Sequence, residues 1–114
     1  MPSRSYYGAR ERAARSRLAQ LLHKHEVIAG SVVTMARPCG KEGCHCAHGE
    51  KHVSLYLSTK EGGKRRMIYI PPDLEERVRR AVGAYRESQE LVQTVSEASL
   101  GRVLQKKRER KKKA

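Results

Sequence analysis

Three cysteines and three histidines lie close together in residues 39 to 52, which read CGKEGCHCAHGEKH. They are all of the cysteines in the chain and three of its five histidines. A set of three thiolates and one imidazole suits the tetrahedral coordination of Zn²⁺. The segment is therefore predicted to be a zinc site that supports a small fold, with Zn²⁺ as the cofactor. The candidate ligands are Cys39, Cys44, Cys46 and His52.

Other interpretations of this segment stay open. His45 and His48 compete for the fourth position, and His52 is preferred because it borders an expected strand that can aim it at the loop. The Cys-x-Cys spacing is tighter than the gap usual in structural zinc sites, so the match is partial. The thiols could instead form a redox pair whose pKa is lowered by nearby cations, or they could be unligated and buried.

The charge of the chain points to a polyanionic partner. Its 114 residues carry 25 Lys and Arg against 12 Asp and Glu, a net charge of +13. Residues 101 to 114 hold eight basic groups and one acidic group, whereas residues 72 to 100 have a net charge of −2. Nucleic acid is the commonest polyanion inside cells. The charge also exceeds the magnitude of about 2 to 8 that keeps a small domain dissolved.

The composition bears on the compartment as well. No stretch approaches the roughly 18 apolar residues that a membrane span needs, and the first residues lack the apolar block of a secretion signal. We therefore expect a cytoplasmic protein without a membrane partner. Structural disulfides are a poor explanation for three clustered cysteines in a reducing compartment.

Helices are predicted at both ends of the chain. Apolar residues recur at helical spacing from Ala9 to Ile28, and Gly30 supplies a stop. After Pro71 and Pro72, Asp73 is expected to cap a helix over residues 73 to 104, with Glu76 completing a capping box. Its nearly heptad seam allows packing on a sheet or half of a coiled coil.

Three strands are predicted between these helices. Ser31 to Arg37 is rich in β-branched residues, and apolar and polar residues alternate over residues 53 to 58. Gly62 and Gly63 suit a tight hairpin leading to a third strand over residues 65 to 70. The predicted fold is α+β: an N-terminal helix, a three-stranded antiparallel sheet with a Cys/His zinc-binding loop, and a long C-terminal helix. Residues 1 to 8 are expected to be flexible, 9 to 104 a single zinc-stabilised domain, and 105 to 114 a disordered basic tail.

The motif Cys39-Gly40-Lys41-x-x-Cys44-x-Cys46-x-x-Gly49-x-x-His52, followed by Tyr69-Ile70-Pro71, resembles a family of small uncharacterised prokaryotic proteins known only as a domain of unknown function. The likeness extends over residues 18 to 100. It supports the domain boundary and the choice of His52, and it implies no activity.

These observations favour a non-catalytic protein that binds nucleic acid, RNA or DNA, as an accessory subunit of a larger complex. Phosphate contacts are predicted for basic residues of the first helix, the loop, the hairpin and the tail, and base stacking for two strand tyrosines. The alternative is a protein-interaction or self-association subunit that uses the helix over residues 73 to 104. No nucleophile with an adjacent base and no Gly-rich phosphate loop is visible, so an enzyme is not expected. The candidate contacts are Arg10, Arg12, Arg15, Arg17, Arg37, Lys41, Lys60, Lys64, Arg65, Arg66, Lys106, Lys107, Arg108 and Arg110, with Tyr56 and Tyr69 for stacking.

Overall fold

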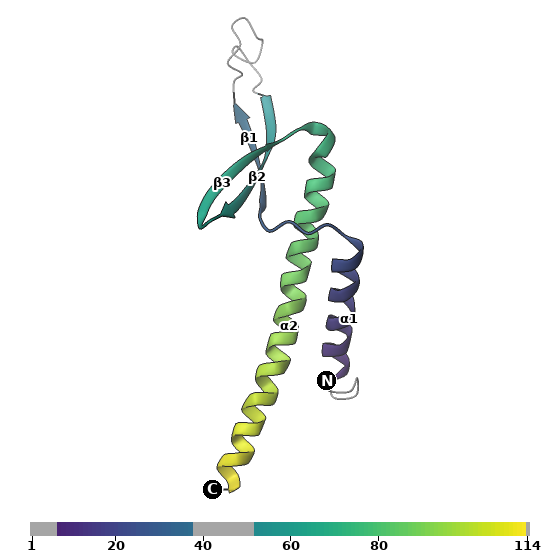
Figure 1. Ribbon diagram of the computed structural model, residues 1–114, viewed down its shortest axis with the longest axis vertical. Coiled ribbons are helices and arrows are strands. Elements are labelled where there is room, and N and C mark those ends of the chain that lie inside the picture. Colours follow the sequence, from purple (N-terminus) through teal and green to yellow (C-terminus); the bar gives the residue numbers. More distant parts are fainter. Residues whose placement is uncertain (1–6, 38–51, 114) are drawn as a thin grey trace, which may run out of the picture. The chain divides into compact units, whose positions relative to one another are not determined.

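The computed structural model describes residues 7–37 and 52–113. Figure 1 shows an α+β arrangement in which two helices flank three strands along the chain. Within the described residues the elements are α1 (Ala9–Lys24), β1 (Ser31–Arg37), β2 (His52–Glu61), β3 (Lys64–Ile70), the 3₁₀ turn η3 (Pro72–Leu74) and α2 (Glu75–Lys113). The predicted order of helix, three strands and long helix is confirmed.

The chain packs as two compact units, whereas the sequence predicted one domain over residues 9 to 104. One unit comprises residues 27–83, and the other comprises residues 1–26 together with 84–114. The helix α2 is long enough to contribute to both units.

The sheet unit is an antiparallel meander in the order β1-β2-β3. Leu55 and Leu57 of β2 are buried against Ile70 of β3 and against Val78 and Val82 in the first turns of α2. The two leucines alternate with Tyr56, as expected of a strand with one face toward a core. The core therefore lies between one face of the sheet and the start of α2.

Two glycine positions shape this unit. Gly62 and Gly63 have φ angles of +59° and +81°, which L side chains rarely adopt, so the pair makes the predicted tight turn between β2 and β3. Gly30, just before β1, lies so close to β2 that an added Cβ would stand 2.7 Å from the carbonyl oxygen of Ser58. Gly30 was expected to stop the first helix, which instead ends at Lys24.

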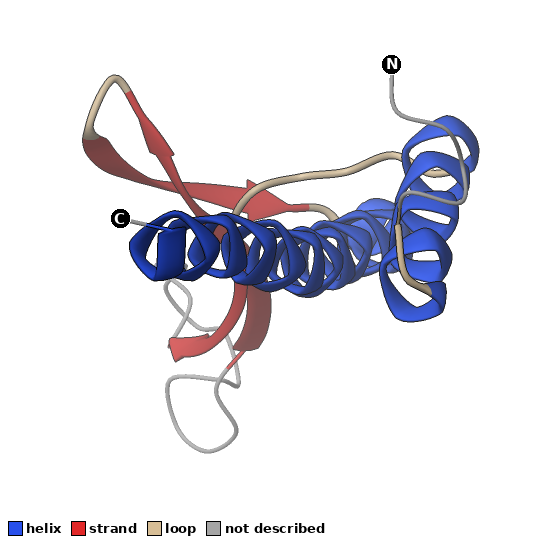
Figure 2. Cartoon of the chain, turned by 90° about the horizontal axis from the view of Figure 1, so that it is seen from below, coloured by secondary structure: helices blue, strands red, loops and turns tan. Residues whose placement is uncertain are grey.

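In the helical unit, α1 runs antiparallel to α2 (Figures 1 and 2). The direction follows from two ion pairs, because Glu11 contacts Arg102 while Arg17, further along α1, contacts Glu87, nearer the start of α2. Ala14 and Leu21 of α1 and Ala84 and Ser88 of α2 are buried. The Ser88 hydroxyl donates a hydrogen bond to the Tyr85 carbonyl oxygen at 2.6 Å, which satisfies the hydroxyl within the helix.

The structure differs from the predictions at both ends of α2. Asp73 lies inside the 3₁₀ turn and the α-helix begins at Glu75, while Glu76 forms an ion pair with Arg80 one turn later. The capping box is therefore not formed as predicted. At the other end, α2 continues to Lys113, where a disordered tail was expected. Lys, Arg, Gln and Glu are good helix formers, and cations near a helix C-terminus are favourably placed.

Within residues 7–37 and 52–113, no helix combines the length and apolar character needed to cross a membrane.

Candidate nucleic-acid interface

The sheet face opposite the core holds both predicted stacking tyrosines. Because side chains alternate along each strand, the residues in register with Tyr56 point to the same side as Tyr56, away from Leu55 and Leu57. We call this surface the tyrosine face. Its central members are Val33 of β1, Tyr56, Ser58 and Lys60 of β2, and Arg65, Met67 and Tyr69 of β3.

Tyr56 and Tyr69 are direct partners across β2 and β3 and pack edge to face. Their ring centroids are 5.8 Å apart and the ring planes make an angle of 65°. Tyr69 is 52% exposed, whereas the next residue, Ile70, is 7% exposed on the core side. An edge-to-face pair covers only one of the four ring faces with the other ring. Flat aromatic surface therefore remains on this side of the sheet.

Met67, one register step nearer the hairpin, extends the apolar part of the tyrosine face. Its side chain is 43% exposed, and it is paired with Ser58 on the neighbouring strand. Met67 was not among the site residues predicted from the sequence. Met67 lies two residues from Tyr69 on the same strand, and because side chains alternate along a strand, this spacing predicts that both lie on the same face.

A second register step brings two cations opposite each other. Lys60 of β2 pairs with Arg65 of β3, and both are exposed. Among the residues that the structure describes, neither forms an ion pair with a carboxylate. Like charges directly opposite on a sheet destabilise the pairing. The hairpin end of the tyrosine face is therefore a site of unbalanced positive charge.

Arg66 differs from its neighbours in the hairpin. It lies on the other side of β3 from Arg65, and its guanidinium donates to a Glu61 carboxylate oxygen at 2.6 Å. Lys64, also exposed, stands opposite Glu61 in the strand register but forms no ion pair with a carboxylate of the described residues. Of the four hairpin cations predicted to contact phosphates, Arg66 is the one that already has an acidic partner.

The arginines of α1 are placed less favourably for phosphate contact than the sequence suggested. Arg17 donates two hydrogen bonds to Glu87, at 2.7 and 3.1 Å, which raises the pKa of Arg17 and lowers that of Glu87. Arg15 donates to Glu11 at 2.8 Å. Arg10 is exposed and Arg12 is half-buried. Two of the four predicted α1 contacts therefore have intramolecular partners.

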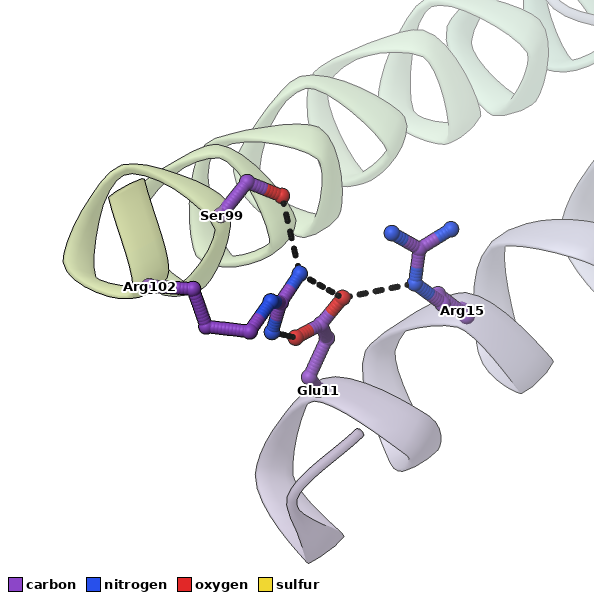
Figure 3. A network of polar contacts seen from close by, with 4 residues as sticks. All are labelled: Glu11, Arg15, Ser99 and Arg102. Atoms are coloured by element: carbon purple, nitrogen blue, oxygen red, sulfur yellow. Dashed lines mark hydrogen bonds and ion pairs between the residues drawn. The ribbon is translucent and has the colours of Figure 1, made fainter. Parts of the chain in front are cut away.

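Glu11 is the centre of a polar network that joins α1 to α2 (Figure 3). It is 3% exposed and accepts hydrogen bonds from Arg15 and from Arg102, whose guanidinium also reaches the Ser99 hydroxyl at 3.3 Å. The hydrogen bond from Arg102 is the main cause that lowers the pKa of Glu11. Both guanidiniums also lie over the Tyr7 ring, 4.1 Å from its centroid for Arg15 and 5.2 Å for Arg102. This network is structural, and it keeps the carboxylate charged.

The end of α2 carries a second group of exposed cations. Lys106, Lys107, Arg108 and Arg110 are all exposed, and Lys106, Lys107 and Arg110 line a surface pocket together with Val103. None forms an ion pair within the described part of the chain. They remain candidates for phosphate contact, on a helix where the sequence analysis expected a disordered tail.

Most of the predicted metal site lies outside the described residues. Cys39, Cys44 and Cys46 belong to residues 38–51, as do Lys41, His45 and His48. His52 is the first residue of β2 and pairs with Arg37, the last residue of β1. Within residues 7–37 and 52–113, no group of three or more His, Cys, Asp or Glu side chains could hold a metal ion. The ladder from β1 to β2 brings Arg37 and His52, the described residues on either side of that segment, to neighbouring positions.

Together, the fold and this surface define a small basic α+β protein with an aromatic sheet face. A family model described as "Domain of unknown function (DUF6788)" matches residues 9–80, which is more than half of the chain. The chain belongs to this family. The match includes α1, all three strands and the first turns of α2, and it stops before the basic end of α2. No curated protein and no solved structure matches the chain.

Proposed function

We propose that this protein binds nucleic acid without catalysis, as an accessory subunit that contacts phosphates through basic side chains. The observation that carries the proposal is the set of exposed cations without an acidic partner among the described residues. Two groups of these cations are Lys60 and Arg65 at the hairpin, and Lys106, Lys107, Arg108 and Arg110 on α2. An anionic partner would relieve the repulsion within each group.

A salt series tests the proposal. Fluorescence anisotropy with labelled oligonucleotides should give binding constants that fall linearly on a log-log plot against salt concentration. Lys60→Gln and Arg65→Gln should each weaken binding and reduce the magnitude of the slope by about 1. Arg17→Gln is the control with the same change in net charge, because Arg17 is already bonded to Glu87. Binding that is absent, or that does not respond to salt, would overturn the proposal.

We also propose that Cys39, Cys44, Cys46 and His52 bind one zinc ion. Support comes from the donor set itself and from the pairing of His52 with Arg37, the described residues that flank the cysteines in the sequence. Bound zinc would add folding free energy to a core that contains no Phe or Trp.

Elemental analysis of the purified protein tests the zinc proposal separately. One zinc per chain is expected, together with a lower melting temperature and loss of the metal in Cys44→Ser. Gln20→Ser, at an exposed position of α1, serves as a control and should retain the metal. A Cys44→Ser protein with unchanged metal content and melting temperature would contradict the zinc site.

A second candidate function is self-association through α2. Val92, Leu100, Val103 and Leu104 are between 40% and 63% exposed, and at 3.6 residues per turn they fall within an arc of about 120° on the helix. Val92 also borders an apolar groove that includes Leu18 and Leu22 of α1. An apolar stripe of this kind fits the partner helix of a second copy.

The charges on α2 favour an antiparallel arrangement of the two copies. Residues 101 to 114 have a net charge of +7, whereas the preceding segment is slightly acidic. Parallel pairing would place two strongly basic ends together, whereas antiparallel pairing about the apolar stripe would place each basic end beside the slightly acidic segment of the other copy. Light scattering after size exclusion should show a dimer that Leu100→Gln with Val103→Gln dissociates. Gln105→Ala, at a neighbouring exposed position, is the control, and a monomeric parent protein would exclude this candidate.

A further inference from the structure

The tyrosine face has the features of a surface for unpaired bases. The first turns of α2 pack on the opposite face of the sheet, where Leu55, Leu57 and Ile70 are buried. On the tyrosine face, Tyr69 and Met67 keep about half of their surface exposed. This contrast between the two faces of one strand shows that the aromatic side of β3 is the accessible one.

Lys60 and Arg65 lie at a distance from the tyrosine rings that one bound strand of nucleic acid could span. Along β2, Lys60 follows Tyr56 by four residues, which is roughly 13 Å at the rise per residue of a strand. Arg65 lies opposite Lys60 and on the same face as Tyr69. A chain lying along these two strands could therefore place bases on the rings and phosphates at the hairpin end.

We infer that the tyrosine face binds single-stranded nucleic acid by stacking bases on Tyr56 and Tyr69 while Lys60 and Arg65 contact the phosphates. The inference rests on the proposed function and names its substrate class. A duplex is excluded from this mode, because its internal bases are stacked on one another and offer no free ring surface. Duplex binding through phosphates alone would not involve the tyrosines.

The two tyrosines could also serve the sheet alone. A cross-strand aromatic pair stabilises a hairpin, so removing one ring lowers the melting temperature whether or not the ring contacts a ligand. The test must therefore separate a loss of stacking from a loss of stability. Tyr69→Leu keeps an apolar side chain on the strand but removes the ring, and Tyr69→Phe keeps the ring.

The experiment measures anisotropy with the full chain and three probes at one fixed salt concentration. The probes are oligo(dT), oligo(U) and a blunt-ended DNA duplex of equal length. Both single strands should bind more tightly than the duplex. Tyr69→Leu should weaken single-strand binding by about 5- to 150-fold while leaving duplex binding unchanged. Tyr69→Phe should bind like the parent protein.

Control measurements complete the design. Tyr85→Leu removes a tyrosine of α2 that accepts a hydrogen bond from Gln89, and it should leave binding unchanged. Because the chain has five Tyr and no Trp, its intrinsic fluorescence reports on tyrosine, and stacking should quench it. The melting temperature of each variant shows whether that variant is folded at the assay temperature. If Tyr69→Leu is unfolded, Tyr56→Leu provides a second test of the ring pair.

The outcomes separate this inference from the function on which it rests. Tighter binding to oligo(U) or to oligo(dT) supports the inference in either case and identifies RNA or DNA as the preferred strand. Equal or tighter binding to the duplex, or a folded Tyr69→Leu protein with unchanged single-strand affinity, overturns the stacking face and leaves phosphate binding intact. Absence of binding to all three probes overturns both.

Discussion

At the scale of single residues, Glu11 is the clearest example of a charge that depends on its neighbours. Its carboxylate is buried between two helices and is hydrogen-bonded by Arg15 and Arg102. A buried carboxylate without such partners would favour its neutral form. The arginines reverse that tendency and hold the pKa of Glu11 below its usual value.

We predict that Glu11→Gln lowers the melting temperature at neutral pH by several degrees, because two guanidiniums lose their anionic acceptor. Since the pKa of Glu11 is lowered by folding, the ionised carboxylate stabilises the protein above its unfolded-state pKa. That contribution is lost as the pH falls through the lowered pKa of the folded state. Thermal denaturation of both proteins over a range of acidic pH should show the difference shrinking.

Glu61→Gln is the matched control for this prediction. Glu61 is also bonded to an arginine, Arg66, but its side chain is 69% exposed. Exposed ion pairs contribute about 0 to 1 kcal/mol, so the melting temperature should change little. If both substitutions lowered the melting temperature equally, the buried Glu11 network would stabilise the protein no more than the exposed Glu61–Arg66 pair does.

Gly30 provides a second prediction at this scale. An added Cβ would approach the Ser58 carbonyl oxygen at 2.7 Å and Leu57 Cδ1 at 3.1 Å, so part of β2 would have to move. We expect Gly30→Ala to lower the free energy of unfolding by about 1 to 3 kcal/mol, measured by chemical denaturation. Gly83→Ala, at an exposed position of α2 where an added Cβ meets nothing within 4 Å, is the control and should not lower the stability.

At the scale of elements, the sheet was predictable because its signals are local. The β-branched run of β1, the alternation in β2 and the Gly62-Gly63 turn each specify structure within a few residues. The same alternation placed Tyr56 and Tyr69 on strands. Their pairing across β2 and β3 also required the register of the hairpin, which the turn determines.

Contacts between distant elements were not predictable in this way. Glu11 and Arg102 are 91 residues apart, and their meeting depends on how α1 packs along α2. Nothing in the spacing of either residue indicates the other. The same holds for Arg17 and Glu87, and this distant pair gives one of the predicted nucleic-acid contacts, Arg17, an acidic partner within the chain.

A substitution at Gly101 tests whether α2 is one continuous helix. A disordered tail was predicted for residues 105 to 114, but the helix runs through Gly101 to Lys113. Because an added Cβ at Gly101 meets nothing within 4 Å, Gly101→Ala should stabilise the helix by up to about 1 kcal/mol. Circular dichroism during thermal unfolding measures this gain. A destabilised variant would show that the helix does not pass unbroken through this position.

At the scale of the whole molecule, the distribution of charge is the dominant property. Residues 101 to 114 hold +7 of the net +13, yet the family match ends at residue 80. Under the proposed function, the sheet unit and the basic end of α2 would be two separate sources of affinity for a polyanion. Phosphate contacts from either source add to the salt dependence of binding.

Deletion of residues 105–114 should lower affinity for single strands and duplexes alike and reduce the slope of log K against log salt. Each lost phosphate contact removes about 0.7 from the slope for a single strand and about 0.9 for a duplex. The preference for single strands should survive, since Tyr56 and Tyr69 are retained. If the deletion abolishes the preference for single strands over the duplex but leaves the slope of log K against log salt unchanged, then α2, and not the tyrosine face, distinguishes the two kinds of nucleic acid.

The opposed cations Lys60 and Arg65 have a consequence for handling the protein. In the free hairpin, ions in the buffer screen the repulsion between them, so the melting temperature should rise with ionic strength. The affinity for a polyanion should change in the other direction. Purification in dilute buffer would then yield the least stable free protein and the one most contaminated with host polynucleotide, and a high-salt wash would correct both faults at once.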